Sequence, residues 1–538
     1  MSIQGDDVVS ASVSTGESPA SAESVGAASR LPIAWIEVAL FVAATAAAAA
    51  LLVPGHFWGD DWTLYVRQAD ALLHGGVHRV IDDVTFTARN STMREFTPEG
   101  YPWGTPALLA VPLALFGRSI AAMKLTMALS LGLAIAGWYA VARRWIGPTA
   151  AFGGAALMMV SLPLISWTNL IASDIPYLAA VGLTALTFAR ATNVGTASLR
   201  RVVGVGAMAA LTFAFRQEGL AVLAAVVLAF AVSHWQAGAP SGSINRQRIA
   251  DWLRPFIRDA AVAVITFVTL TTLVRVLLPS QVLPRYSTAG PARIRPNLPF
   301  FARSIGAQFG VFDPVDARVE AFGSPPLGWL LIGLLVTAAA AGGWVVLQRR
   351  NPLDVLMVAI ASSHTYGALT FPFPDTRYMF VPVAITCFVV ASGVDAAARR
   401  IPRPAAGRPR MLVGAAVLGL LIVNQVSPYV TAARGAATAR RIDRPAFSPF
   451  EPEPQQMFAA VRERTAVDDV IAFSAARAMT YFTDRRAVQV RGADAVPPVA
   501  DWFVVELTRG ELSPAPAGFA ETWRNDRYAL LRAEDASG

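Results

Sequence analysis

Two adjacent carboxylates follow the first apolar stretch of the chain. Asp60 and Asp61 lie in GHFWGDDWTLYVRQADALL, directly after residues 31–53. Ionisable side chains at the end of a membrane helix are costly unless they are solvated, cap a helix or act in chemistry. Apolar residues recur at helical spacing after the pair, which predicts an amphipathic helix along the membrane surface. This segment alone fits helix capping and a chemical role equally well.

Further polar residues interrupt the apolar sequence near the ends of other predicted spans, all on one side of the membrane. They are Asp174, Arg216, Glu218, Arg285, Tyr286, Asp375, Arg377 and Tyr378. Each alone has a structural explanation, such as a turn, an internal Arg216–Glu218 ion pair or an interfacial anchor. Together, carboxylates and arginines at one bilayer surface suit a lipid phosphate leaving group and an acceptor hydroxyl.

The composition places most of the chain in lipid. Of 538 residues, 54% are hydrophobic and only 15% are charged, whereas soluble proteins carry about 25% charged residues. The formal charge of +8 comes almost entirely from arginine, and Lys124 is the only lysine. The lone Cys387 lies in an apolar stretch, which excludes a disulfide framework and a thiolate metal site.

We expect about eleven membrane-spanning helices, because a span needs about 20 apolar residues. The predicted spans are residues 31–53, 119–141, 149–171, 175–191, 202–215, 219–232, 260–278, 327–347, 353–371, 379–394 and 411–426. The fifth and sixth are short, so the boundary between them is the least defined. A further apolar helix over residues 105–116 is expected to be interfacial or re-entrant.

The arginine distribution predicts the orientation. Clusters such as Arg143/Arg144, Arg349/Arg350 and Arg399/Arg400 fall on alternate connections, which is the positive-inside pattern. Residues 1–30, rich in Ser, Ala and Gly, are then a disordered cytoplasmic tail. An odd number of spans leaves the C-terminus outside. We therefore expect a multi-pass protein of the inner (plasma) membrane.

The predicted fold is a polytopic α-helical membrane protein with a small extracytoplasmic C-terminal α/β domain. Residues 31–428 form the transmembrane module, with outer loops at residues 55–104 and 280–326, and residues 429–538 form the domain. The domain combines a helix near residues 457–464 with four strand-like runs. It contains no phosphate loop, metal spacing or nucleophile elbow, so we expect a supporting or acceptor-binding role.

These motifs resemble those of the GT-C glycosyltransferases, in particular the bacterial branch related to protein O-mannosyltransferases and lipid A aminoarabinose transferases. Asp60-Asp61 match the acidic pair of the first outer loop, and Asp174 matches a second acid between the third and fourth spans. TPEGYPWGTPALLAVPLALFG has the layout of the family's proline-rich stretch and interfacial helix, with Tyr101-Pro102-Trp103 replacing the usual double proline. Arg216 to Gly219 resemble an Arg-x-Glu-Gly element, and Arg377-Tyr378 resemble an Arg-Tyr that opens a late span.

The resemblance implies a GT-C-like bundle that moves a hexosyl or pentosyl group from a polyprenyl-phosphate donor on the outer face. The acceptor would be a hydroxyl of an envelope glycan, lipid or protein, and no nucleic acid is involved. A carboxylate in a partly desolvated pocket makes a workable base. Asp60 would act as that base, Asp61 would orient it or the acceptor, and Asp174 would position the acceptor or a metal. A single displacement would invert the anomeric centre.

The departing phosphate needs positive charge, which arginines supply well. Arg216, Arg285 and Arg377, with Tyr378, are the predicted phosphate-binding residues, and Glu218 would support Arg216. A divalent ion is the other means of stabilising the phosphate. His56 and His364 would ligate it beside the acidic pair, but no ligand spacing matches a known site, so metal dependence stays open.

Two other functions fit parts of the sequence. A transporter or flippase of lipid-linked sugars would also place acids and arginines inside a bundle, although internal repeats and broken midplane helices are not evident. A non-enzymatic membrane scaffold would leave the acidic pair and the Arg216–Glu218 element without a task. The sugar, the acceptor and the oligomeric state are not determined by the sequence.

Overall fold

The computed structural model describes most of the chain. The described residues are 33–59, 61–92, 101–192, 198–237, 246–279, 289–312, 324–349, 351–400, 409–442, 448–491, 496–507 and 518–534. Asp60, Arg285, Tyr286 and the predicted tail of residues 1–30 lie outside these ranges.

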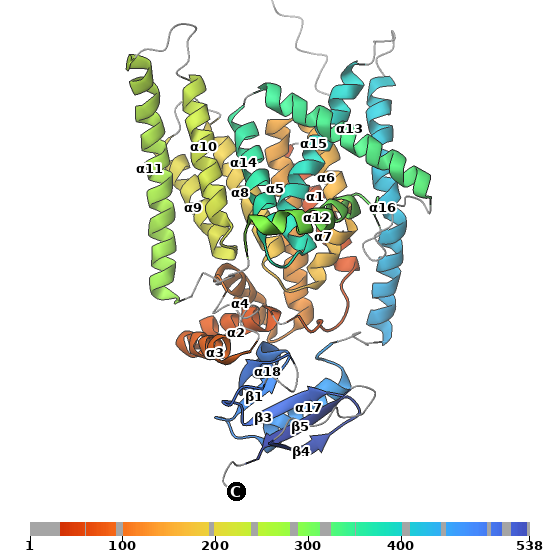
Figure 1. Cartoon of the computed structure of the whole chain (residues 1–538). Helices are drawn as coiled ribbons and strands as arrows, with labels where there is room; N and C mark the ends of the chain where they lie inside the picture. Colours follow the sequence, from red (N-terminus) through yellow and green to blue (C-terminus); the bar gives the residue numbers. More distant parts are fainter. Residues whose placement is uncertain are drawn as a thin grey trace, which may run out of the picture.

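A helix stands at each of the predicted spans, and these helices form one bundle (Figure 1). They are α1 (Ile33–Ala50), α5 (Ile120–Trp145), α6 (Pro148–Val160), α8 (Asp174–Thr192), α9 (Leu199–Phe215), α10 (Gly219–Ala237), α11 (Arg246–Leu277), α13 (Pro325–Arg349), α14 (Pro352–Thr370), α15 (Phe380–Arg400) and α16 (Pro409–Ile442). In the described part of the chain, seven helices are long and apolar enough to cross a membrane. The number is eight if α6 and the segment Leu162–Asn169, bent by 57° at Ser161, count as one span. The chain is therefore a multi-pass membrane protein.

Small residues let two of these helices pack closely. Gly342 on α13 faces Gly393 on α15, and a Cβ at Gly342 would lie 1.9 Å from the carbonyl oxygen of Val389. A Cβ at Gly393 would lie 1.9 Å from the carbonyl oxygen of Ala338. Helices in lipid associate largely through such close packing, so this contact fixes α13 against α15.

Short helices cover one end of the bundle. α2 (Asp61–His74), α3 (Val77–Asn90) and α4 (Gly104–Phe116) lie between the bundle and the C-terminal domain (Figure 1). The predicted amphipathic helix is confirmed as α2, which buries Trp62, Tyr65 and Val66. The helix α12 (Ile294–Gln308) precedes α13, and the 3-10 turns η3 (Pro291–Arg293) and η4 (Thr376–Met379) precede α12 and α15. Two further short elements, α7 (Leu162–Ser166) and η2 (Trp167–Asn169), connect α6 to α8.

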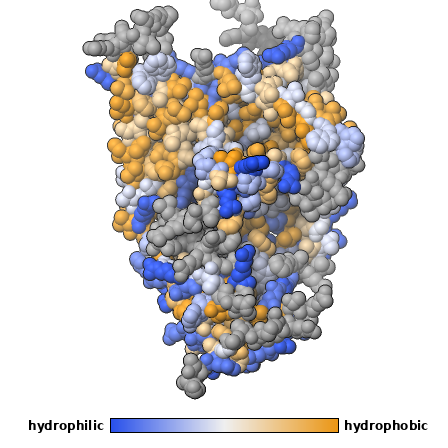
Figure 2. Space-filling view, viewed as in Figure 1, coloured by the Kyte–Doolittle hydropathy of each residue, from blue (hydrophilic) through white to orange (hydrophobic). Residues whose placement is uncertain are grey.

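The C-terminal domain is a five-stranded sheet with two helices. The sequence predicted an α/β domain with one helix and four strands, and it missed the helix Ala476–Thr483 and the strand Phe519–Arg524. Its elements are α17 (Pro452–Arg464), β1 (Val470–Phe473), α18 (Ala476–Thr483), β2 (Arg486–Gln489), β3 (Trp502–Glu506), β4 (Phe519–Arg524) and β5 (Tyr528–Ala533). The strand order is β2-β1-β3-β5-β4. β1 is parallel to β2 and β3, whereas β5 is antiparallel to β3 and β4. Figure 2 shows hydrophobic residues over the bundle and mostly hydrophilic residues over this domain.

Aromatic side chains join the domain to the loop after α1. The indole of Trp58 packs among Phe458, Phe473 and Tyr528 of the domain, at ring distances of 6.1, 5.9 and 6.5 Å. Trp62 contacts the ring of Tyr481 at 5.2 Å.

Polar contacts add a second attachment through α3. Arg67 and Arg486 both pair with Asp83, at 2.8 and 3.2 Å, and Thr87 donates to the carbonyl of Ala487 at 2.7 Å. The domain is therefore packed firmly onto α2 and α3.

Candidate active site

The loop between α1 and α2 is held in place by side chains from other helices. Asn169 accepts a hydrogen bond from the Val53 N–H at 2.8 Å and donates to the Leu51 carbonyl at 2.7 Å. Lys124 donates to the Val53 carbonyl at 2.9 Å. Together they satisfy backbone groups left unpaired where α1 ends, and they fix the start of α2.

A hydrogen bond between His56 and Ile171 attaches this loop to the turn before α8. Its Nε2 accepts the backbone N–H of Ile171 at 3.0 Å, and its Nδ1 donates to the Phe57 carbonyl at 3.0 Å. Burial lowers the pKa of His56 to about 3, with Phe57 acting in the opposite direction. The imidazole is therefore neutral, and its hydrogen bond with Ile171 joins the loop before Asp61 to the turn before Asp174.

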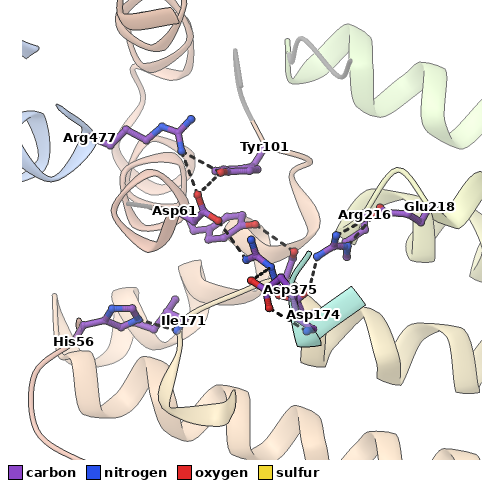
Figure 3. Close-up of polar contacts among 12 residues, drawn as sticks. His56, Asp61, Tyr101, Ile171, Asp174, Arg216, Glu218, Asp375 and Arg477 are labelled. Atoms are coloured by element: carbon purple, nitrogen blue, oxygen red, sulfur yellow. Dashed lines mark hydrogen bonds and ion pairs between the residues drawn. The ribbon is translucent and has the colours of Figure 1, made fainter. Parts of the chain in front are cut away.

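Asp61 opens α2 and is bound from three directions (Figure 3). Its Oδ1 accepts a short hydrogen bond from the Tyr101 hydroxyl and lies 3.3 Å from Nη1 of Arg477. Its Oδ2 lies 3.5 Å from Nη1 of Arg377. Burial opposes ionisation, but Arg377 and Arg477 outweigh it and hold the pKa of the Asp61 carboxyl below its ordinary value. Asp61 is therefore an ionised carboxylate and a weak base.

Asp174 and Arg216 form a buried pair at the ends of α8 and α9. The guanidinium of Arg216 donates a short hydrogen bond to Oδ1 of Asp174 and pairs with Glu218 at 2.8 Å. Burial would raise the pKa of Glu218, but Arg216 lowers it to about 2. The side chain of Asp174 is 4% exposed, and its Oδ2 has no hydrogen-bond partner among the described residues. One buried carboxylate oxygen is thus left without a hydrogen-bond partner in the described part of the site.

Arg377 connects Asp61 with the group formed by Asp174, Arg216 and Glu218. Its Nε lies 3.1 Å from Oδ2 of Asp375, while its Nη1 reaches Asp61. Asp375 caps η4 by accepting the backbone N–H of Arg377 at 3.1 Å. Burial raises the pKa of Asp375, although Arg377 opposes the shift. The guanidinium groups of Arg377 and Arg216 lie over the ring of Tyr378, at 5.3 and 5.5 Å.

The result is one network of acids and arginines at the junction of bundle and domain (Figure 3). The side chains of Asp61 and Asp375 are 37% and 33% exposed, so a molecule entering the site can reach them. Arginines can bind phosphate oxygens through paired N–H groups. The arrangement can therefore orient a hydroxyl and bind an anion in the same place.

An apolar cavity lies beside this network. It has a volume of about 270 Å³ and is lined by residues of α9 and α11 and by Pro102 and Trp103 at the start of α4. Phe213 lines it three residues before Arg216, and Arg275 also lines it. The cavity could hold an apolar chain, and its lining residues Pro102 and Phe213 are close in sequence to Tyr101 and Arg216 of the charged site.

The structure brings together most of the residues singled out from the sequence. Asp61, Asp174, Arg216, Glu218, Arg377 and Tyr378 meet in the network, whereas Asp60 and Arg285 lie outside the described residues. His364 contacts the Tyr177 hydroxyl at 2.6 Å and the Ile360 carbonyl at 2.8 Å. Across the described ranges, no three His, Cys, Asp or Glu side chains group so as to hold a metal ion. Both ring nitrogens of His56 and of His364 contact neighbouring groups.

Sequence reasoning missed two members of the network and assigned no role to a third. Tyr101 lies in the stretch Tyr101-Pro102-Trp103, which sequence reasoning gave no role, and Arg477 belongs to the C-terminal domain. Asp375 was noticed beside Arg377 but given no task. For Arg477 the available signal was a single arginine inside the otherwise apolar run FSAARAMTYF.

Comparison with solved structures identifies the fold. The structure of ArnT from Cupriavidus metallidurans bound to undecaprenyl phosphate is 14% identical and matches with a TM-score of 0.54, covering 94% of this chain and 98% of that one. The chain has the GT-C glycosyltransferase fold. The oligosaccharyltransferase of Archaeoglobus fulgidus, tethered to an acceptor peptide, matches at a TM-score of 0.52 and 12% identity. That match covers 88% of this chain and 69% of the other.

A family model supports the same fold over part of the chain. The model described as dolichyl-phosphate-mannose-protein mannosyltransferase matches residues 101–240, which run from Tyr101 through α10. No curated protein matches this chain by sequence.

Proposed function

We propose that the chain is a membrane glycosyltransferase that moves a sugar from a polyprenyl-phosphate donor to an acceptor hydroxyl of the cell envelope. The observation that carries the proposal is the network of Asp61, Asp174, Asp375, Arg216 and Arg377, set in a GT-C fold. Undecaprenyl phosphate bound to ArnT supports a polyprenyl-phosphate donor. The sugar is a hexosyl or pentosyl group, and the acceptor is an envelope glycan, lipid or protein.

In the proposed reaction the acceptor oxygen attacks the anomeric carbon. The bond from that carbon to the phosphate oxygen breaks, and its electron pair leaves with the polyprenyl phosphate. The acceptor proton passes to Asp60 as general base. The lowered pKa of Asp61 and its three donors support an orienting role for Asp61. Asp174 would position the acceptor or a metal. Attack from the face opposite the phosphate inverts the sugar carbon.

The donor phosphate is assigned to Arg216, Arg285 and Arg377, with Tyr378. Negative charge grows on the phosphate as it leaves, and guanidinium groups stabilise such charge. Arg377 contacts both Asp61 and Asp375, whereas Arg216 is already paired with Asp174 and Glu218. The apolar cavity beside Arg275 offers space for the isoprenoid part of the donor.

We further propose that the chain resides in the inner (plasma) membrane with its N-terminus in the cytoplasm. The network and the C-terminal domain would then face outward, where envelope acceptors are found. The arginine pattern supports this orientation. Residue Arg349 of α13 donates to the carbonyl of Trp145 at 3.0 Å, so the basic ends of α5 and α13 lie together.

Bond formation is the decisive test. Membranes that contain the chain are incubated with radiolabelled polyprenyl-phosphate mannose and, separately, polyprenyl-phosphate arabinose. We expect label to enter envelope acceptors, and Asp60→Asn to reduce transfer by about two to four powers of ten.

The control is Asp82→Asn, an exposed acid of α3, which should transfer normally. If Asp60→Asn and Asp61→Asn both stay within a few-fold of the unchanged chain, the acidic pair is not the base. A transporter or a scaffold would form no labelled bond with either donor.

A further inference from the structure

We infer that Arg477, supplied by the C-terminal domain, is a positioning residue that fixes the Asp61 carboxylate for transfer. The domain would then be part of the active centre and not only a support or an acceptor platform. The inference rests on the proposed function, because it assigns a task within that reaction.

The contacts of Arg477 cross from the domain to the membrane module. Its Nη1 lies 3.3 Å from Oδ1 of Asp61 and donates to the Tyr101 hydroxyl at 3.0 Å. Its guanidinium also lies over the Tyr101 ring, at 5.2 Å. The same hydroxyl donates to Asp61. Arg477, Tyr101 and Asp61 therefore form a closed triangle of hydrogen bonds (Figure 3).

Burial makes this arrangement costly unless the charge is compensated. The side chain of Arg477 is 4% exposed, and an unpaired buried charge is strongly disfavoured. Arg477 lies on α18, a short helix whose other residues are largely buried. The helix is held against α2 by the contact of Tyr481 with Trp62. The guanidinium is thus presented to Asp61 by a rigid element.

Four groups face Asp61, and each has a defined effect. Arg377 comes from η4 and Arg477 from α18, and both favour the ionised carboxylate. Tyr101 donates a hydrogen bond to it, and Tyr65 of α2 lies close enough for its own pKa to be raised by Asp61, after burial. Removing Arg477 takes away one of two cations and one of two contacts to Oδ1. The carboxylate would then bind a proton at higher pH and lose a fixed orientation.

The test compares two arginines of the same domain. Arg477→Met removes the charge while keeping the length of the side chain, and Arg477→Lys keeps the charge. The control is Arg485→Met, because Arg485 donates to the carbonyls of Thr483, Arg462 and Thr465 inside the domain. Each variant is purified as the full chain. Its thermal unfolding and its transfer rate from radiolabelled polyprenyl-phosphate sugar are measured between about pH 3 and pH 9, because the ordinary pKa of an Asp carboxyl, about 3.9, lies within that range.

We expect Arg477→Met to lower kcat at pH 7 by about ten- to a hundredfold, with KM for the donor changed by less than a few-fold. The acidic limb of its pH profile should move to higher pH, and Arg477→Lys should restore part of the rate. Arg485→Met should lower the unfolding temperature and keep the pH profile of the unchanged chain.

Two results would overturn the inference. One is an unchanged kcat and pH profile in Arg477→Met while the unchanged chain is active. The other is a loss of rate in Arg477→Met that only follows its unfolding temperature, as in Arg485→Met. If the unchanged chain transfers neither sugar, the proposed function fails and the inference fails with it.

Discussion

Arg216 pairs with two acids, Asp174 and Glu218, and these pairs give it a structural role. Asp174 is almost fully buried, and its Oδ1 accepts a short hydrogen bond from the guanidinium of Arg216. Arg216→Met should therefore destabilise the protein by about 3–5 kcal/mol, because it leaves a buried carboxylate uncompensated. Thermal unfolding of the detergent-solubilised chain measures this loss.

The double variant Arg216→Met/Asp174→Asn is the control, since it removes both charges and should recover much of the stability. A residue whose main task is to bind phosphate behaves differently. It would leave stability near normal and abolish only the protection that added polyprenyl phosphate gives against unfolding. That second outcome would place Arg216 on the donor.

At the scale of residues, the sequence identified those whose types are unusual for a membrane end. Asp61, Asp174, Arg216 and Arg377 stand out because charge is rare in an apolar sequence. Their pairing was not predictable, since the partners come from distant segments. Arg477 is 416 residues from Asp61, and nothing local in α18 indicates that its arginine points into the membrane module.

At the scale of elements, the glycine contact between α13 and α15 makes a sharp prediction. Gly342→Ala should lower the unfolding temperature, at a cost of about 1–3 kcal/mol, because the new methyl group would overlap the Val389 carbonyl. Gly343→Ala on the same helix is the control. A Cβ at Gly343 meets nothing within 4 Å, and alanine favours helix, so this variant should be as stable or slightly more stable.

Thermal unfolding in detergent again provides the measurement. Equal unfolding temperatures for the two alanine variants would mean that the close approach of α13 and α15 does not stabilise the bundle. A loss confined to Gly342→Ala would support it.

The elements themselves were largely predictable, because apolar length and turn residues act locally. The break between the fifth and sixth spans shows why only its exact position was uncertain from sequence. α9 ends at Phe215 with Arg216 as its cap, and α10 begins at Gly219. A Cβ at Gly219 would lie 2.4 Å from the backbone nitrogen of Phe213. Such a tight turn depends on backbone packing and not on hydropathy.

At the scale of the whole molecule, the orientation in the membrane is the main prediction. In a Cys387→Ala background, Thr92→Cys should react with a membrane-impermeant maleimide in intact cells. Ser198→Cys should react only after permeabilisation. Both positions are exposed, and the proposed orientation, with arginine-rich helix ends inside, puts Ser198 on the cytoplasmic side.

The unchanged chain lacking both new cysteines is the control for background labelling. Protection of Thr92→Cys in intact cells, with labelling of Ser198→Cys, would reverse the orientation. The bundle and the domain would keep their structure, but the proposed acceptor would have to be cytoplasmic.

Trp58 packs into the C-terminal domain, so this part of the structure can form only after the domain has been synthesised. Ribosomes make the chain from its N-terminus, so the loop that carries Trp58 and Asp61 emerges long before β5. Until residues near Tyr528 have been made and translocated, Trp58 has no core to enter. We therefore expect nascent chains to hold an open, aromatic-rich loop that a membrane chaperone can bind. The site would be completed only after the C-terminal domain has been made, so a chain stalled before this domain would be inserted but inactive.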